Sequence, residues 1–327
     1  MKSLLKKSIY VFLPLLVSVF SGCEKEIEFD GDITRPGLTL ASQASVGSPL
    51  TVYVSSSIFF LENEETGNIF FENLDTARGK VRCFVNGSNS GEELVLMRQF
   101  SVNSLCYMAD YVPAPGDHIR LEAEFPGYDM LWAETDVPLM PDFELLSVTW
   151  KKSETDNVSW LFEDEEQEYY EAELTLAVTD NASYEKYYFL QPLITQTDPW
   201  TQTEWTTSLT FTSNDVIFQQ MDGSQLQVST LDGGFFTGGY FSDALIKGQR
   251  YVFKIQVSYV PDREKLISFD LLAAAVNENL YWYDNSYLQV AEGMNGLFGE
   301  GVTLYSNVHG GYGVFCAAAP VFLKVEW

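Results

Sequence analysis

The sequence predicts an all-β protein with one substantial helix. Short runs of alternating apolar and polar residues recur along the chain, as half-buried strands require, and residues 50–55 are the clearest example. Turn dipeptides such as Asn86-Gly87 and Pro126-Gly127 separate these runs. Only near residues 277–292 does the apolar pattern change to a helical period. About 300 residues follow the N-terminal apolar run, which suggests two domains.

The N-terminal segment, residues 1–22, is predicted to be a lipoprotein signal peptide. A basic start with three lysines precedes an apolar run at residues 9–20, which is shorter than the roughly 20 residues that a bilayer span needs. Phe20-Ser21-Gly22-Cys23 then resembles a lipobox. That resemblance implies lipid attachment at Cys23, which anchors the mature protein to a membrane without spanning it. An unlipidated signal with a chance cysteine is the alternative.

Residues 23–35 are predicted to form an acidic tether between the anchor and the folded part. Glu24-Lys25-Glu26-Ile27-Glu28 resembles the surface-export signal of Bacteroidota lipoproteins. The resemblance implies an outer-membrane protein that faces the cell exterior. A plain solvated tether on a periplasmic protein is the alternative.

Composition excludes some classes of function. Without residues 1–22 the chain carries 16 basic and 46 acidic residues, a formal net charge of −30 against −27 for the whole chain. The electrostatic field of such a negative chain repels nucleic acid and anionic lipid headgroups. The chain is 46% hydrophobic and 15% aromatic, enough for a real core. No second apolar run approaches 18 residues, so no transmembrane helix is predicted after the signal.

Residues 36–140 are predicted to form an immunoglobulin-like β-sandwich. Strand-like runs lie at residues 50–55, 81–85, 94–97, 105–111, 119–125 and 131–137. Short strands at this spacing, with glycine-bearing turns between them, favour a sandwich of about 100 residues. Pro138-Leu139-Met140-Pro141 is then the expected linker.

Residues 141–327 are predicted to form a larger, sandwich-type β-rich domain that carries the helix. Its strand-like runs lie at residues 145–150, 173–178, 187–194, 208–212, 251–259, 266–274 and 321–325. The helix is indicated by apolar residues spaced 4, 3, 4 and 3 apart: Val276, Leu280, Tyr283, Tyr287 and Val290. Asn277 is the expected N-cap, and Gly293 marks the expected end.

Three further cysteines follow Cys23 in the chain. Cys83 and Cys106 lie in two strand-like runs, and a disulfide between them is allowed in an exported protein. It would close a loop of about two dozen residues and contribute roughly 3 kcal/mol. Two separately buried thiols are the equal alternative. Cys316 is expected to pack as a small apolar side chain.

Two long motifs give the chain a family resemblance. One begins at Pro115-Gly116-Asp117-His118-Ile119 and continues through Phe125-Pro126-Gly127-Tyr128. The other runs Val302-Thr303-Leu304-Tyr305-Ser306-Asn307-Val308-His309-Gly310-Gly311-Tyr312-Gly313-Val314-Phe315. They resemble domain of unknown function 4249, a set of Bacteroidota lipoproteins. Cys316, where a glycine is common, and His309-Gly310 depart from the family pattern. The resemblance implies an accessory lipoprotein of an uptake system, encoded beside a TonB-dependent receptor, and it carries over no catalytic residue.

The chemical motifs predict no catalytic, cofactor-binding or metal site. His118 and His309 are the only histidines, so H-E-x-x-H is impossible, and no C-x-x-C, G-x-S-x-G or phosphate loop occurs. The acidic run at residues 163–168 is interpreted as a solvated face, with calcium binding the alternative. Gly310-Gly311-Tyr312-Gly313 is interpreted as a structural closure of the second domain, with a ligand cradle the alternative.

Three tryptophans are the candidate contacts with a partner or ligand. Trp200 and Trp205 lie in a polar loop, and Trp282 lies off the apolar stripe of the helix. Packing back onto the core is the alternative for each. Together these observations predict a non-enzymatic partner of a TonB-dependent receptor in nutrient uptake. An adhesin or envelope structural protein is the second hypothesis, and a surface glycosidase or peptidase is the least supported.

Overall fold

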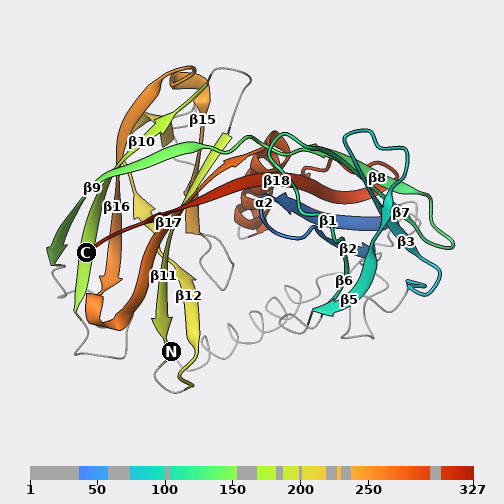
Figure 1. The fold of residues 1–327 in the computed structure, drawn as a ribbon, viewed down its shortest axis with the longest axis horizontal. Helices are drawn as coiled ribbons and strands as arrows, with labels where there is room; N and C mark the ends of the chain where they lie inside the picture. Colours follow the sequence, from blue (N-terminus) through green and yellow to red (C-terminus); the bar gives the residue numbers. More distant parts are fainter. Residues whose placement is uncertain are drawn as a thin grey trace, which may run out of the picture. The chain divides into compact units, whose positions relative to one another are not determined.

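The computed structural model describes residues 37–57, 74–99, 104–152, 168–181, 187–198, 201–218, 227–229, 237–294 and 303–327. Residues 36–327 form one compact unit, whose ribbon is drawn in Figure 1. The signal peptide, the tether with Cys23, residues 163–167 of the acidic run and Trp200 lie outside the described residues, whereas Glu168 is exposed and pairs with Lys152 at 2.5 Å. No helix in the described part of the chain has the length and apolar character needed to cross a bilayer.

The strands of the described residues form three sheets. The largest has the order β14-β15-β11-β17-β18-β1-β2-β6-β5, and β12 pairs with β11 beside this path. Its strands are β1 (Leu38–Ser45), β2 (Thr51–Ser56), β5 (Val95–Gln99), β6 (Ser104–Met108), β11 (Tyr187–Thr197), β12 (Glu204–Ser208), β14 (Gln227–Ser229), β15 (Thr237–Ser242), β17 (Leu266–Val276) and β18 (Gly311–Lys324).

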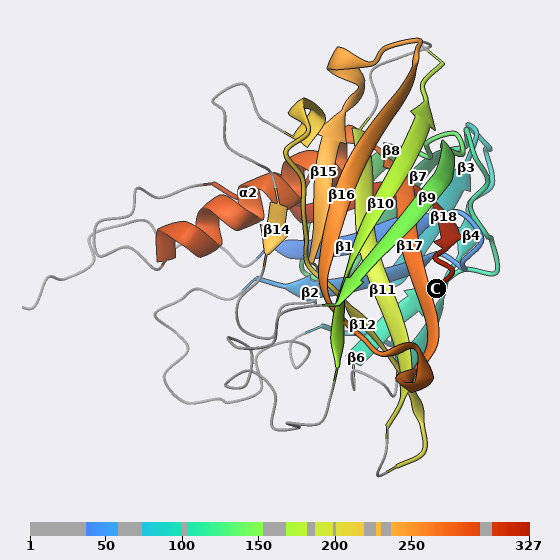
Figure 2. The ribbon, with the colours of Figure 1, turned by 90° about the vertical axis from the view of Figure 1, so that its left-hand side faces the viewer.

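Two smaller sheets cover the two ends of the large one. One has the order β4-β3-β7-β8, with β3 (Lys80–Val85), β4 (Glu92–Glu93), β7 (His118–Glu124) and β8 (Leu131–Asp136). The other has the order β13-β16-β10-β9, with β9 (Asp142–Lys152), β10 (Tyr169–Thr179), β13 (Phe211–Thr212) and β16 (Arg250–Pro261). Figure 2 shows β9, β10 and β16 as one layer across β11 and β17. Short 3₁₀ helices are η3 (Val216–Phe218), η4 (Asp243–Leu245) and η5 (Arg263–Lys265).

Each small sheet encloses a hydrophobic core against the large sheet. The first core lies between β3, β7 and β8 on one side and β1, β2 and β6 on the other. The second lies between β9, β10 and β16 and the strands β11 and β17. Alternate strand residues point inward, as in β7, where Ile119, Leu121 and Ala123 are fully buried. The predicted all-β class with one substantial helix is confirmed, and α2 (Glu278–Met294) is the only α-helix among the described residues.

Strand β18 belongs to both cores. Residues 311–318 pair in parallel with β1, whereas residues 318–324 pair antiparallel with β17. Phe315 and Ala317 are therefore fully buried in the first core, although they follow the expected linker by more than 170 residues. The division at residue 140 stays a prediction about independent folding, and the first core is completed by the C-terminal strand.

The helix begins as the sequence predicts. The Asn277 side-chain oxygen accepts a hydrogen bond from the Leu280 backbone N–H at 3.2 Å, which is the expected N-cap. The apolar face of α2 packs on the outer side of the large sheet through Leu280, Tyr281 and Leu288. Tyr287, expected on the buried stripe, is 51% exposed. The buried stripe is therefore narrower than the sequence pattern suggests.

The disulfide considered between Cys83 and Cys106 is not formed. Cys83, Cys106 and Cys316 are all free and buried. Cys83 on β3 points into the first core. On β6, Tyr107 points into that core, so its neighbour Cys106 points to the opposite face of the strand. Side chains of adjacent strand residues alternate between faces, so the two thiols lie on different sides of the large sheet. The alternative of separately buried thiols holds.

Candidate functional site

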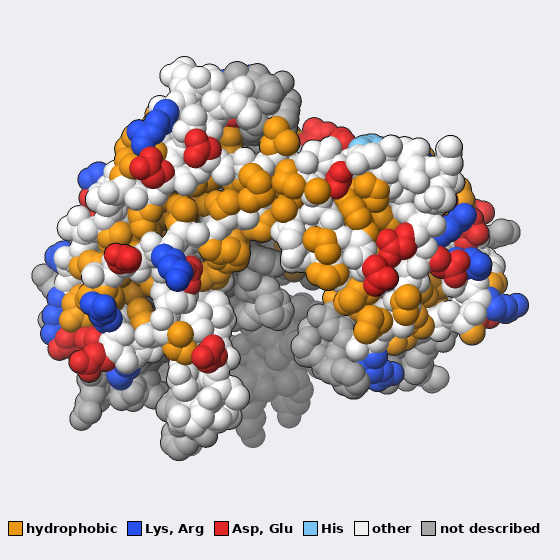
Figure 3. Space-filling view, in the orientation of Figure 1, with side chains coloured by type: hydrophobic (Ala, Val, Ile, Leu, Met, Phe, Trp, Pro, Cys, Tyr) orange, Lys and Arg blue, Asp and Glu red, His pale blue; other side chains and the backbone are white. Residues whose placement is uncertain are grey.

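A groove of about 830 Å³ opens where the two cores meet, and we name it the junction groove. It lies among the end of β8, the linker after it, the start of α2 and the extended segment 303–310, named the strap. Its lining consists of Gly116, His118, Trp132, Glu134, Thr135, Asp136, Val137, Pro138, Leu139, Tyr187, Val276, Asn277, Glu278, Asn279, Asn307 and His309. Both histidines of the chain line it. Figure 3 shows histidine and acidic side chains at the upper edge of the molecule.

His118 lies between two carboxylates. It faces Asp136 across the β7–β8 pair, and its Nδ1 is 2.8 Å from Asp136 Oδ1. Its Nε2 lies 4.0 Å from Glu134 Oε2. The His118 side chain is 47% exposed and the Asp136 side chain 84% exposed, so this pair contacts water. The imidazole is held at the mouth of the groove.

Two side chains of the protein itself contact the indole ring of Trp132. The His309 ring stacks on it with centroids 3.9 Å apart and an interplanar angle of 15°. The Arg120 guanidinium carbon lies 4.2 Å from the Trp132 ring centroid. Arg120 also donates to Glu134 at 2.8 Å and to Glu122 at 3.0 Å, and the bond to Glu134 is the largest cause that raises the Arg120 pKa. The stack therefore fixes one wall of the groove.

Backbone hydrogen bonds attach the strap to the first sandwich. The Trp132 N–H donates to the His309 carbonyl at 3.0 Å, and the His309 N–H donates to the Trp132 carbonyl at 2.8 Å. At its other end, the Tyr305 hydroxyl donates to Asn279 Oδ1 at 2.8 Å, and the Tyr305 N–H donates to Ser286 Oγ at 2.9 Å. The strap thus connects β8 with helix α2.

Two asparagine side chains hold the floor of the groove together. Asn307 Nδ2 donates to the carbonyls of Glu134 at 3.1 Å and Phe315 at 2.8 Å, and its Oδ1 accepts from the Phe315 N–H at 2.9 Å. Asn277 Nδ2 donates to Thr135 Oγ1 at 2.6 Å, and its Oδ1 accepts from the Ala317 N–H at 3.0 Å. Each amide joins segments that are more than 100 residues apart in the sequence.

The glycines after the strap are required by close backbone contacts. A Cβ at Gly313, whose φ is +117°, would lie 1.9 Å from the Leu40 carbonyl oxygen. A Cβ at Gly310, whose φ is +76°, would lie 2.2 Å from the Met130 carbonyl oxygen. Only glycine combines these conformations with such approaches. The interpretation of Gly310-Gly311-Tyr312-Gly313 as a structural closure is supported. The prediction placed this closure in the second domain, whereas the glycines contact β1 and the start of β8 in the first core.

The candidate tryptophans lie in different places. Trp282 is 43% exposed on α2, and its ring packs edge-on against Tyr187, which lines the junction groove. Trp205 on β12 is 45% exposed and does not line the groove. Sequence reasoning missed Trp132, Asn277 and Asn307 as groove residues. One feature of the sequence could have pointed to the groove: His118 and His309 each lie inside one of the two long motifs that resemble the family.

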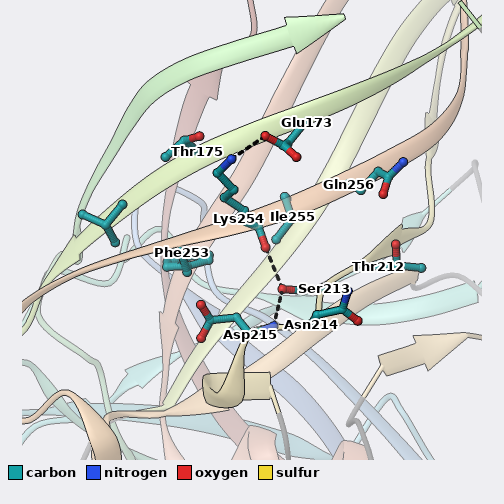
Figure 4. A pocket seen from close by; sticks show the side chains of 11 residues that line it. Glu173, Thr175, Thr212, Ser213, Asn214, Asp215, Phe253, Lys254, Ile255 and Gln256 are labelled. Carbon is teal, nitrogen blue, oxygen red and sulfur yellow. Dashed lines mark hydrogen bonds and ion pairs between the residues drawn. The ribbon is translucent and has the colours of Figure 1, made fainter. Parts of the chain in front are cut away.

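A second groove, of about 490 Å³, lies on the outer face of β10 and β16, and we name it the sheet groove (Figure 4). Lys254 and Glu173 form an ion pair across it at 2.6 Å. Ser213 Oγ donates to the Lys254 carbonyl at 2.6 Å and accepts from the Asp215 N–H at 3.2 Å. Asp215 Oδ1 accepts from the N–H of Ile217 in η3 at 3.1 Å. These polar groups pair with one another across β10 and β16 and hold the turn at residues 213–215 against β16.

Two titratable groups, Asp284 on α2 and Cys316 on β18, are buried and lie near each other. Burial raises the pKa of Asp284, and the bond that it accepts from the Tyr240 hydroxyl works against this shift. Burial, with the Asp284 charge second, raises the pKa of the Cys316 thiol to about 12. Cys316 therefore stays a protonated, unreactive thiol at neutral pH. No three of the His, Cys, Asp and Glu side chains in the described residues form a group that would hold a metal ion.

Fold and groove together define a two-core β-sandwich protein with a polar groove at the junction of its cores. In a comparison with known families, residues 24–321 match the family described as Domain of unknown function (DUF4249). The chain belongs to this family. No curated protein matches the chain.

Proposed function

We propose that this protein is a lipid-anchored outer-membrane lipoprotein on the cell exterior that works as a non-enzymatic partner of a TonB-dependent receptor in nutrient uptake. The observation that carries the proposal is the lipobox-like Phe20-Ser21-Gly22-Cys23, directly followed by a family match that begins at residue 24. An anchor in that position leaves the whole folded unit outside the bilayer.

Exposed apolar side chains support a partner-binding function. On β18, Tyr312 is 56% exposed and Phe322 is 63% exposed. Figure 3 shows hydrophobic side chains gathered in a band across this face of the molecule. Contiguous apolar surface rimmed by polar residues is typical of sites where proteins associate. The junction groove adds a recessed polar surface within the volume range of ligand sites.

Co-purification tests the proposal. The tagged full chain is extracted from its native membrane in mild detergent, and the proteins that elute with it are identified by mass spectrometry. We expect a TonB-dependent receptor in the eluate of the wild type and its absence from the eluate of a separately tagged, unrelated lipoprotein. A preparation that never contains such a receptor contradicts the proposal.

Lipid attachment has its own measurement. Intact-mass analysis of the mature protein is expected to show acyl chains on Cys23, and Cys23→Ser is expected to abolish them and to release the protein from the membrane fraction. Protease added to whole cells is expected to digest the wild-type protein, as an exterior location requires. Resistance to that protease would place the protein on the periplasmic side.

A further inference from the structure

The junction groove has a one-sided charge. Three carboxylates line it, Glu134, Asp136 and Glu278, and its described lining contains no lysine or arginine. Arg120, the nearest guanidinium to Glu134, is engaged with Glu122 and Glu134. The groove therefore favours a cationic guest and repels an anionic one.

Its carboxylates are accessible to a guest. The Asp136 side chain is 84% exposed and that of Glu134 is 41% exposed, and Glu278 is exposed in the first turn of α2. A carboxylate offers about four acceptor positions, so the bond between Asp136 and His118 leaves Asp136 able to accept further hydrogen bonds, which water makes in the free protein. An ammonium or guanidinium would replace that water with a charge-assisted bond.

An exposed aromatic ring, Trp282, lies one helical turn after Glu278 and outside the groove lining. Both side chains therefore lie on the same side of α2. The ring is 43% exposed and rests against Tyr187, a lining residue of the groove. Cations bind over tryptophan faces, and the aliphatic stem of arginine or lysine packs on the same surface. The rim thus offers a second, independent feature suited to a cationic side chain.

Other ligand classes fit the described lining less well. A sugar platform inside the groove needs an open ring face in its lining, but there Trp132 is stacked by His309 and contacted by Arg120, and Tyr187 is stacked by Tyr281 at 4.2 Å. The described groove residues also form no group suited to a metal ion. A volume of about 830 Å³ exceeds the size of one guanidinium, and Leu139, 41% exposed, adds apolar lining for flanking residues. An extended peptide segment uses all of these features.

We propose that the junction groove binds an arginine or lysine side chain on an extended segment of a protein partner, with Glu134, Asp136 and Glu278 receiving the charge and Trp282 covering the stem. This inference rests on the proposed function, because it names the chemistry by which the receptor, or another protein, would be held.

The two histidines allow a direct test. Because the chain contains only His118 and His309 and both line the groove, ¹³C-histidine labelling yields two ring signals that report on this site alone. The full chain, carrying a histidine-free tag, is titrated in detergent with the capped peptide Gly-Ser-Arg-Tyr-Gly. We expect saturable shifts of the histidine signals, and no saturable shift with the peptide in which arginine is replaced by glutamate.

Matched variants locate the binding. The double variant Asp136→Asn, Glu278→Gln is expected to weaken arginine-peptide binding about tenfold, since two charge-assisted contacts are lost. Glu264→Gln, in the exposed turn between β16 and β17, removes a charge elsewhere and is expected to leave binding unchanged. Equal shifts with the glutamate peptide, no saturable shift with the arginine peptide, or equal weakening by Glu264→Gln would overturn the inference. Unchanged circular dichroism would show that the variants are folded.

The same variants separate this inference from the proposed function. If the receptor co-purifies equally with the wild type and the double variant, the receptor partnership stands and the groove is not its contact. If the arginine peptide binds but no receptor co-purifies, the groove stands as a site for a different protein and the proposed function fails.

Discussion

The junction groove and the sheet groove are both polar hollows, but they are assembled in opposite ways. The sheet groove draws on β10, β13, the turn at residues 213–215 and β16, and its serine and aspartate side chains complete that turn and bind it to β16. The junction groove draws on five segments from Gly116 to His309, and its amides bridge segments that are distant in the chain. The sheet groove needs only the strands of one small sheet and the turn beside them, whereas the junction groove exists only when the two cores are joined.

The largest effect expected from this difference is at Gly313. Gly313→Ala places a methyl group 1.9 Å from the Leu40 carbonyl oxygen at a φ of +117°, so β18 must separate from β1. We expect a loss of at least about 3 kcal/mol in the free energy of unfolding, measured by urea denaturation. Gly47→Ala is the control, since its φ is +85° but nothing lies within 4 Å of the added Cβ, and about 1 kcal/mol is expected there. Equal losses would show that the parallel pairing is dispensable.

The amide of Asn307 gives the next largest effect. Asn307→Ala removes three hydrogen bonds that join β8 and β18, for which about 2–3 kcal/mol is expected at roughly 1 kcal/mol each. Ser213→Ala in the sheet groove removes one bond to the Lys254 carbonyl on β16 and one bond within the turn, and is expected to cost about 1–2 kcal/mol. Thermal denaturation of both variants measures the contrast. A larger loss at Ser213 would reverse the comparison.

A smaller effect on stability, which depends on pH, is expected at Asp284 on α2, the helix that lines the junction groove. Burial raises the pKa of Asp284, so ionising this carboxyl costs stability as pH rises through its raised value, and the stability is greatest below its ordinary range near 3.8. Asp284→Asn keeps an acceptor for Tyr240 and removes that ionisation. We expect the variant to gain stability relative to the wild type as pH rises from 4.5 to 7.5. A stability difference that is constant across this range would contradict the shift.

The smallest effect is expected at the ion pair of the sheet groove. The Lys254 and Glu173 side chains are 61% and 49% exposed, so Lys254→Met should change the free energy of unfolding by less than about 0.5 kcal/mol. Arg120→Met in the junction groove removes two carboxylate contacts and the Trp132 contact at a side chain only 31% exposed, and about 1–2 kcal/mol is expected. Similar values from urea denaturation of the two variants would remove this distinction between the grooves.

Much of the fold was predictable because its signals are local. The alternation of apolar and polar residues predicted the positions of β2 and β7, and the N-cap residue Asn277 predicted the start of α2. The cysteine question was open because strand-like runs do not reveal which face of which sheet a side chain takes, and Cys83 and Cys106 took different faces. The groove was not predictable because a pairing such as Trp132 with His309 joins positions that no local pattern relates.

The sequence by itself determined the β-rich class, the helix with its cap, the family and the glycines that demand unusual backbone conformations, since each depends on residue type and near neighbours. Only the tertiary structure decided that β18 serves both cores and that the two histidines share one groove. The physical reason is that parallel pairing and side-chain bridges between distant segments depend on how whole sheets pack, which local periodicity does not encode.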